Sequence, residues 1–217
     1  MKARKPTLNE GQRRWVREWW TALQPRGPDD TPPQGELAAF KRGTRALLRR
    51  AWNVETLLEL QSVFVLARGL IRRGDDCWPL RDETGSYDRV ALVAGVLSHV
   101  LKDANRGETL AAQLGKPVAG ERPLMNELRF QSLLRARDAS ELFLQWRRAV
   151  QLAREADVAQ VADDLLTWLA ELQSPSPALI RAHDSVKFHW AYDYYLASKP
   201  EEAGARQDPV SDEEINA

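Results

Sequence analysis

Arginine is the residue type through which this chain could do chemistry, and its spacing predicts arginines on the outer faces of helices. In the segment 37–51 (LAAFKRGTRALLRRA), six residues at helical spacing form an apolar stripe: Leu37, Phe40, Thr44, Leu47, Leu48 and Ala51. Five cations lie opposite this stripe or beside it: Lys41, Arg42, Arg45, Arg49 and Arg50. No acidic residue follows Glu36 in the segment, although surface helices usually mix charges of both signs. The pattern therefore predicts a face that binds a polyanion.

A second group of arginines lies between residues 122 and 154. The stretch holds seven arginines, three acidic residues and no lysine. Four of these arginines, in the predicted helices 124–136 and 139–154, are candidates for contact with a polyanion: Arg129, Arg135, Arg147 and Arg148. A planar guanidinium binds two phosphate oxygens at once and stacks on bases, whereas an ammonium group acts as a point charge. Bridges between arginines and carboxylates are the alternative interpretation, but three acids are too few to pair seven arginines.

The sequence contains none of the common catalytic or metal-binding motifs. A glycine-rich phosphate loop, H-E-x-x-H, G-x-S-x-G and paired C-x-x-C sequences are all missing. His99 falls on an apolar helix, and His183 and His189 are six residues apart, which places them on different helix faces. Three pairs of adjacent acids should diverge and predict no acid–base dyad: Asp29–Asp30, Asp75–Asp76 and Asp163–Asp164. We therefore expect a protein without enzymatic activity, cofactor or metal ion.

Charge is balanced overall but unevenly distributed. The chain has 217 residues with 31 basic and 31 acidic side chains; the first 50 residues hold twelve basic and five acidic ones, and 199–217 holds two and six. Composition alone favours a solvated surface with an acidic tail, because most charge runs are solvated. The single cysteine, Cys77, is expected to be a buried thiol, and one cysteine excludes an intramolecular disulfide. With no signal-like N-terminus and no apolar run of membrane length, we expect a soluble cytoplasmic protein that does not contact membranes.

Apolar residues at helical spacing, in segments separated by helix-breaking proline and glycine residues, predict an all-α fold of about eight helices. The predicted helices cover 8–23, 36–51, 54–73, 87–104, 124–136, 139–154, 158–173 and 178–198. Predicted N-terminal caps are Asn53, Ser86, Asp138 with Glu141, Asp157, and Ser176 with Pro177. The loops 24–35 and 74–85 separate the first helices, and the irregular stretch 105–123 predicts a boundary between two packed halves, 1–115 and 116–198. Residues 199–217 predict an acidic disordered tail.

Tryptophan is abundant, with eight residues, and helical spacing assigns four of them to the core. Trp15, Trp19, Trp146 and Trp168 fall on apolar stripes, which favours packing over base stacking. Trp190 lies in the aromatic run 187–195 and is ambiguous, since that helix could close the bundle or dock onto a neighbouring protein.

Five motifs in one order resemble the CasB family, the small subunit of the type I-E CRISPR surveillance complex called Cascade. They are W-x3-W-W (15–20), G-T-R-A-L-L-R-R-A (43–51), N-E-L-R-F-Q-S-L-L-R-A-R-D (126–138), Q-W-R-R-A-V-Q-L (145–152) and H-W-A-Y-D-Y-Y (189–195). Each motif is weak alone, but the five in this order are specific. The proline-rich insert 24–35 and the acidic tail depart from a compact small subunit and look like variable additions.

The resemblance implies a helical subunit, without enzymatic activity, that is present in two copies within an RNA-guided complex. Its implied partners are guide RNA, target and displaced DNA strands, other Cascade subunits and a second copy of itself. Base pairing with the guide then reads the sequence, while protein subunits hold backbone. The residues that match the family's motifs and carry this role are Arg45, Arg49, Arg50, Arg129, Arg135, Arg147 and Arg148, with Lys187 as a weaker candidate. The competing hypothesis is an all-α adaptor whose arginine faces pair with acidic surfaces of partner proteins.

Overall fold

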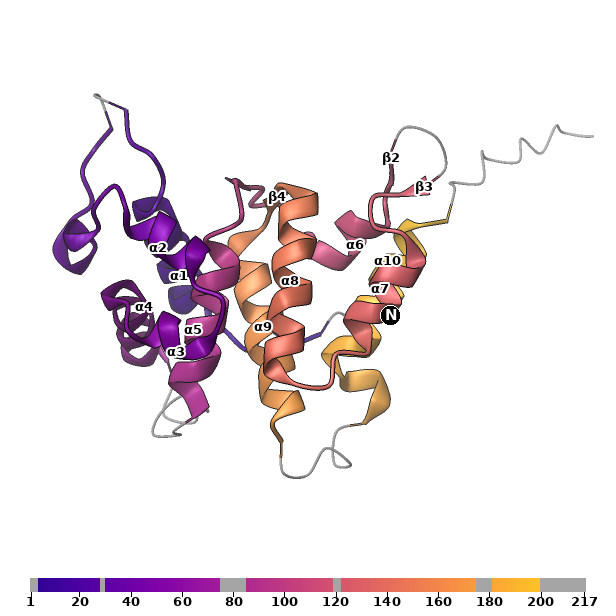
Figure 1. Ribbon diagram of the computed structural model, residues 1–217. Helices are drawn as coiled ribbons and strands as arrows, with labels where there is room; N and C mark the ends of the chain where they lie inside the picture. Colours follow the sequence, from indigo (N-terminus) through magenta and orange to yellow (C-terminus); the bar gives the residue numbers. More distant parts are fainter. Residues whose placement is uncertain (1–3, 28–29, 75–84, 119–121, 175–180, 200–217) are drawn as a thin grey trace, which may run out of the picture.

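The computed structural model describes residues 4–27, 30–74, 85–118, 122–174 and 181–199, and within them the protein is all-α as predicted (Figure 1). The α-helices are α1 (Glu10–Ala22), α2 (Thr44–Arg50), α3 (Val54–Leu58), α4 (Gln61–Arg73), α5 (Gly85–Leu97), α6 (Leu110–Gly115), α7 (Glu127–Leu134), α8 (Ala139–Ala153), α9 (Val158–Leu172) and α10 (Val186–Ala197). Short 3-10 turns occupy Gly35–Ala39 and Ala182–Asp184. Within the described ranges, no helix combines the length and apolar character that a membrane span requires.

Two pairs of two-residue strands accompany the helices. β1 (Lys102–Asp103) pairs in parallel with β4 (Glu155–Ala156), which fastens the segment after α5 to the segment after α8. β2 (Pro117–Val118) and β3 (Arg122–Pro123) form an antiparallel pair after α6. These strands are too short to show an alternating sequence pattern, so the sequence did not predict them.

The core is built around α5 and α9. α5 packs against α3, α4, α8 and α9, and α1 packs against α4 and α9. Every residue from Val90 to Val100 is buried, which explains why this stretch is apolar on nearly all sides. Three indoles meet where α8, α9 and α10 converge: Trp146 and Trp190 have ring centroids 4.3 Å apart, and Trp168 lies 5.3 Å from Trp190. The core assignment of Trp15, Trp19, Trp146 and Trp168 is confirmed, and α10 closes the bundle through the buried Trp190.

Several predicted helix caps are confirmed. Asn53 accepts a hydrogen bond from the Thr56 N–H, and Asp157 accepts from the N–H groups of Ala159 and Gln160. Asp138 accepts from the Glu141 N–H, but the Glu141 carboxylate accepts from the Arg137 N–H and not from the cap residue itself.

Two predicted helices in the first half are each interrupted. The segment 36–51 breaks at Phe40, whose extended backbone (φ −75°, ψ 118°) ends the 3-10 turn and turns its ring into the core against Trp19. Leu47, predicted to be on the apolar stripe, is 52% exposed as a result. The segment 54–73 breaks at the extended Leu60 (φ −93°, ψ 121°), which allows α3 to pack against both α4 and α5.

Other predicted boundaries are also corrected. The helix predicted for 87–104 ends at Leu97, because the chain turns into β1 and the Leu101 N–H donates to the Arg154 carbonyl. Ser86 lies within α5 and not before it. The stretch 105–123 contains α6, and the last helix starts at Val186 with Ser185 as its cap. The cap predicted at Ser176–Pro177, residues 75–84 with Cys77, and 200–217 of the predicted tail lie outside the described residues.

Gly115 marks a close approach of α6 to α10. A Cβ atom added at Gly115 would lie 2.3 Å from the carbonyl oxygen of Tyr194, so that only glycine fits there. α6 thus packs on the last helix of the chain, although the predicted boundary assigns it to the first half. The division into two halves stays a prediction.

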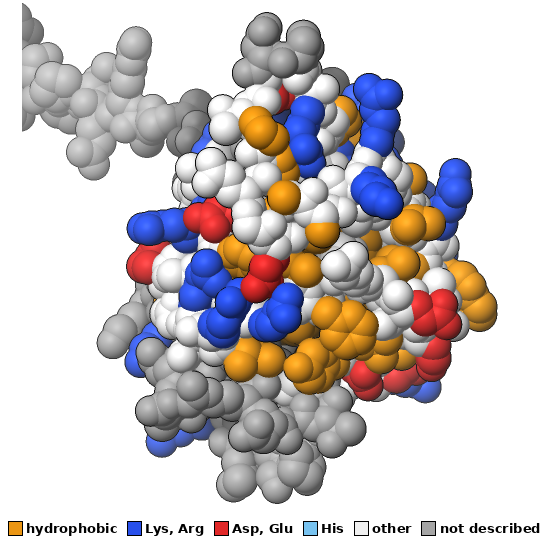
Figure 2. All heavy atoms as spheres, turned by 90° about the vertical axis from the view of Figure 1, so that its left-hand side faces the viewer, with side chains coloured by type: hydrophobic (Ala, Val, Ile, Leu, Met, Phe, Trp, Pro, Cys, Tyr) orange, Lys and Arg blue, Asp and Glu red, His pale blue; other side chains and the backbone are white. Residues whose placement is uncertain are grey.

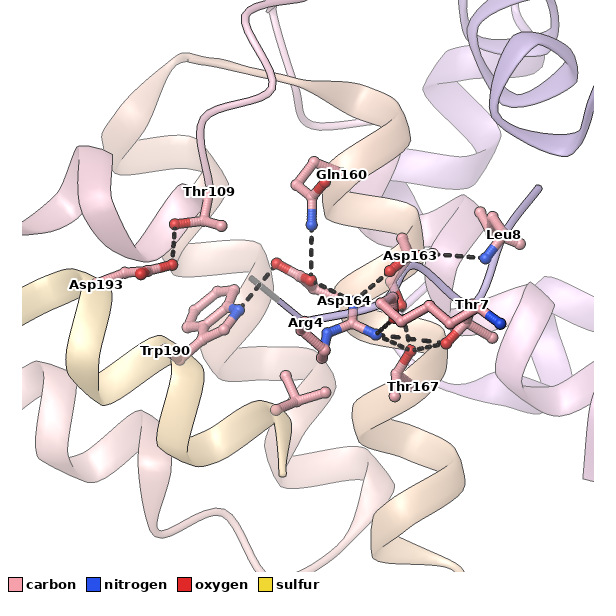
Figure 3. Close-up of polar contacts among 12 residues, drawn as sticks. Arg4, Thr7, Leu8, Thr109, Gln160, Asp163, Asp164, Thr167, Trp190 and Asp193 are labelled. Atoms are coloured by element: carbon pink, nitrogen blue, oxygen red, sulfur yellow. Dashed lines mark hydrogen bonds and ion pairs between the residues drawn. The ribbon is translucent and has the colours of Figure 1, made fainter. Parts of the chain in front are cut away.

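The N-terminal segment is anchored on α9 by a buried ionic network (Figure 3). Arg4 forms ion pairs with both Asp163 and Asp164, whose side chains are 0% and 3% exposed. Asp163 Oδ1 also accepts from the Leu8 N–H at 2.6 Å, and Asp164 Oδ2 accepts from the Trp190 indole at 3.0 Å. Burial raises the pKa of Asp164, and the Arg4 charge opposes that shift. The sequence predicts no common role for these adjacent acids, but both pair with the same arginine.

Candidate nucleic-acid interface

A cleft of about 820 Å³ lies where the segment after α1, the segment 40–50, the end of α5 and α8 meet. Seven cationic side chains line it: Arg26, Lys41, Arg42, Arg45, Arg49, Arg50 and Arg147. No carboxylate occurs among the described residues that line the cleft. Seven cations without a counter-charge raise the local positive potential, and such a site attracts an anion with several charges.

Arg45 is a half-buried anchor of this cleft, although its position opposite the apolar stripe predicts an exposed side chain. Its Nε donates to the Ser98 carbonyl at 2.9 Å and its Nη2 to the Val100 carbonyl at 2.6 Å, while Nη1 contacts the Gln24 side chain. Both carbonyls lie just beyond α5, where a cation is favoured by the helix dipole. Burial lowers the pKa of Arg45, and the charge of Arg49 lowers it further.

Arg147 has the same kind of role at the end of α2, which also corrects the prediction of an outer position. Its Nη1 donates to the Ala51 carbonyl at 3.1 Å and its Nη2 to the Arg49 carbonyl at 3.0 Å. The guanidinium lies 5.2 Å from the centre of the Phe143 ring, and burial lowers its pKa. α8 therefore holds the C-terminal end of α2 in place.

His99 connects the two anchors. Its Nε2 accepts a hydrogen bond from Arg147 Nε at 3.1 Å, and its Nδ1 lies 2.9 Å from the Gln151 amide. Burial lowers the pKa of His99 to about 4, and the charges of Arg147, Arg49 and Arg45 contribute to that shift. The imidazole is thus neutral near pH 7, and its exposed fraction of 4% agrees with its place on an apolar helix.

The cations free to meet a ligand are those on the rim of the cleft. They are the exposed Lys41, Arg42, Arg49 and Arg50. Arg26 is also exposed, but its Nη2 donates to the carbonyls of Ala22 at 3.2 Å and Phe40 at 3.4 Å. Figure 2 shows basic side chains in two groups on this face of the molecule, one toward the top and one lower on the left, with exposed hydrophobic side chains between and below them. Lys41 and Arg26 enter the cleft only because the chain turns at Phe40 and after α1, which helical periodicity could not reveal.

The remaining predicted residues lie elsewhere. Arg148 is exposed on α8 but does not line the cleft. Arg129 and Arg135 are exposed at α7, and Lys187 is half-buried on α10 with its Nζ 5.9 Å from the Trp168 ring centre. In Figure 1, α7 and α10 lie on the opposite side of α8 from α2. The structure therefore brings together Arg45, Arg49, Arg50 and Arg147, but not the other four.

The cleft is suited to binding and offers little for bond-making. His99 has a low pKa and hydrogen-bonded ring nitrogens, so it is a poor general base at neutral pH. Across the described part of the chain, no group of three or more His, Cys, Asp or Glu side chains could hold a metal ion.

The fold and the cleft together define an all-α protein with a concentrated cationic surface. The chain belongs to the family of CRISPR-associated protein Cse2, whose model matches residues 44–195. It is similar to the crystal structure of CasB from Thermus thermophilus, with a TM-score of 0.53, 25% sequence identity, and coverage of 86% of this chain and 98% of that one.

A second similar structure is that of E. coli Cascade bound to a PAM-containing double-stranded DNA target. The TM-score is 0.51 over 91% of this chain and 98% of the matched chain, and the 15% identity supports a shared fold alone. No curated protein sequence is significantly similar to this chain. The resemblance to the CasB family inferred from the five motifs is confirmed.

Proposed function

We propose that this protein is the non-catalytic small subunit of a type I-E Cascade complex in the cytoplasm. In that complex it would hold the sugar–phosphate backbone of guide, target and displaced strands and stabilise the R-loop. The observation that carries the proposal is the cleft with seven cations and no carboxylate among its described lining residues. Membership of the Cse2 family and the fold shared with a chain of DNA-bound E. coli Cascade support it. Its partners would be the other Cascade subunits and a second copy of itself.

Within the proposed interface the arginines divide into two roles. Arg49 and Arg50, with Lys41 and Arg42, contact phosphate oxygens, because their side chains are exposed on the cleft. Arg45 and Arg147 instead position α2, which carries Arg49 and Arg50, because their own N–H groups donate to backbone carbonyls. Arg148, Arg129, Arg135 and Lys187 lie outside the cleft and stay predicted contacts for a second track across α8, α7 and α10.

The test is target-DNA binding by complexes reconstituted with a variant that replaces Arg42, Arg49 and Arg50 with alanine. Each lost phosphate contact reduces the slope of log affinity against log salt by about 0.7 to 0.9, so we expect a slope smaller by about two units and a less stable R-loop. A variant with alanine at Arg106, Arg122 and Arg137 removes three exposed charges outside the cleft and should bind DNA normally.

Unchanged R-loop stability with the cleft variant fully incorporated would refute the proposed binding of nucleic-acid phosphates by the cleft arginines, which we call the backbone grip. Failure of that variant to enter the complex, with its fold intact, would instead favour the competing hypothesis of an adaptor whose arginines pair with acidic partner surfaces.

A further inference from the structure

Trp52 is exposed in a protein that buries its other described tryptophans. Its side chain is 71% exposed, more than that of any other aromatic residue in the described part of the chain. Trp15, Trp19 and Trp20 are buried and donate their indole N–H groups to backbone carbonyls. Burying an indole stabilises a fold by a few kcal/mol. A tryptophan left on the surface therefore suggests that its ring contacts a partner.

The backbone on both sides of Trp52 is fixed, although the ring is not packed. The preceding residue, Ala51, ends α2 and accepts a hydrogen bond from Arg147. The following residue, Asn53, caps α3 and accepts from both the N–H and the hydroxyl of Thr56. The ring is thus presented from a short link of defined geometry between two helices, so that a ligand would not have to order the backbone.

The charges around Trp52 select the kind of ligand. Arg49 and Arg50, both exposed, lie three and two residues before it at the end of α2. Glu55, on the first turn of α3, is exposed after it. An anionic chain would therefore approach from the α2 side, where the cleft opens, and end its contact at Trp52. An aromatic ring beside cations that hold phosphates is the arrangement that binds single-stranded nucleic acid.

We propose that Trp52 stacks on an unpaired base of a single strand whose phosphates lie along Arg49 and Arg50. The inference rests on the proposed function and adds a specific preference to it, since a base inside a duplex cannot offer its face to the ring. Stacking does not depend on base identity, because every base has a flat face, so sequence selectivity should stay weak.

The experiment compares two 12-nucleotide probes of equal charge, oligothymidine and an abasic deoxyribose-phosphate chain, binding to the full-length protein at low salt. Replacing Trp52 with alanine should weaken oligothymidine binding by about 5- to 150-fold, which corresponds to one stacked base. The abasic chain, which has nothing to stack, should bind the variant and the unchanged protein equally. The conservative variant Trp52→Phe should retain most of the oligothymidine affinity.

Three control variants separate stacking from other effects. Phe64→Ala removes an aromatic ring that is 47% exposed on α4 and should leave both probes unaffected. Glu55→Gln removes a negative charge without changing a ring, and should strengthen the binding of both probes alike. The double variant Arg49→Ala with Arg50→Ala should weaken the binding of both probes and reduce the salt slope.

The outcomes distinguish this inference from the proposed function. If Trp52→Ala leaves oligothymidine binding unchanged, or weakens both probes equally, the stacking role is refuted and the backbone grip stands. If it binds both probes normally but no longer enters the complex, Trp52 is a protein contact and the inference is also refuted. If the unchanged protein binds neither probe at low salt, the stacking role fails, while the backbone grip is decided separately by the cleft variant in the reconstituted complex.

Discussion

Arg4 Nη2 donates a hydrogen bond of 2.8 Å to Oδ1 of Asp164, across 160 residues of sequence. The same guanidinium pairs with Asp163, so one cation compensates two buried carboxylates (Figure 3). The contact attaches the start of the chain to α9 and, through the Trp190 indole that donates to Asp164, to α10.

Removal of this cation should destabilise the fold. Arg4→Ala would leave two buried carboxylates without a counter-charge, and we expect a loss of about 3 kcal/mol or more in the free energy of unfolding at pH 7. Urea denaturation measures the loss, and Arg14→Ala, at an exposed site on α1, should change it by less than about 0.5 kcal/mol.

The loss of unfolding free energy in Arg4→Ala should increase with pH. Burial already raises the pKa of Asp164, and without Arg4 it would rise further, so that the folded variant binds protons more readily than the unfolded chain. The destabilisation should therefore be smaller near pH 4 and grow as the pH rises to 7. A constant difference between the two proteins across this range would contradict the account.

His99 should make stability fall as the pH is lowered. Its folded pKa of about 4 lies below the unfolded value of 6.5, so the unfolded chain takes up the proton first. The contribution is present above pH 6.5 and is lost between pH 6.5 and 4. It amounts to as much as about 3 kcal/mol, since one pKa unit corresponds to about 1.4 kcal/mol.

Comparison with His99→Gln isolates this residue, because all other groups titrate in both proteins. The variant should lose less stability than the unchanged protein between pH 7.5 and 4.5, as measured by urea denaturation. Parallel pH profiles would show that His99 does not titrate differently on unfolding.

The two anchoring arginines should behave differently from their exposed neighbour. Arg45→Ala and Arg147→Ala each remove two or more hydrogen bonds from backbone carbonyls at helix ends and should cost about 2 kcal/mol. Replacing either arginine with lysine should not preserve the stability, because an ammonium group lacks the planar guanidinium that donates to two carbonyls at once. Arg49→Ala, at an exposed position, should cost less than about 0.5 kcal/mol. Equal thermal stability of all three alanine variants would contradict the assignment of anchors.

Gly115 offers a test of the contact between α6 and α10. Gly115→Ala would place a methyl group 2.3 Å from the Tyr194 carbonyl oxygen, and since backbone cannot yield as a flexible side chain does, we expect a loss of about 1–3 kcal/mol. Gly43→Ala, where an added Cβ meets nothing within 4 Å, is the matched control and should be nearly neutral. Equal unfolding midpoints for the two variants would show that the helices separate in solution.

The spacing of apolar residues predicted an all-α fold correctly, because residues at helical spacing form the face of a helix that is buried in the core. The stripe of α8 and the largely apolar α5 are both found in the structure, and so are the caps Asn53, Asp138 and Asp157. Periodicity could not predict the breaks at Phe40 and Leu60, because both residues continue an apolar pattern while their backbones are extended. Those breaks depend on tertiary packing, which overrides local preference.

The sequence predicted that the candidate site is rich in arginine, but not which arginines are exposed and which are held by backbone carbonyls. A count of arginines against acids identified a surplus of cations, yet Arg45 and Arg147 differ from Arg49 only in which carbonyls approach them. Those carbonyls come from residues about 50 or more positions away, such as Val100 for Arg45 and Ala51 for Arg147. For the same reason the role of Arg4 was not foreseen, since nothing near it in sequence indicates two buried aspartates on α9.

The anchoring of α2 has a mechanical consequence. A helix of seven residues is too short to hold its shape alone, yet it carries Arg49 and Arg50 on the cleft. Arg147 fastens its end to α8, and Arg45 fastens its first turn to the end of α5. Tension on a strand bound there would pass through these two guanidinium groups into the buried interior, so that the bundle as a whole, and not the short helix, would resist the pull.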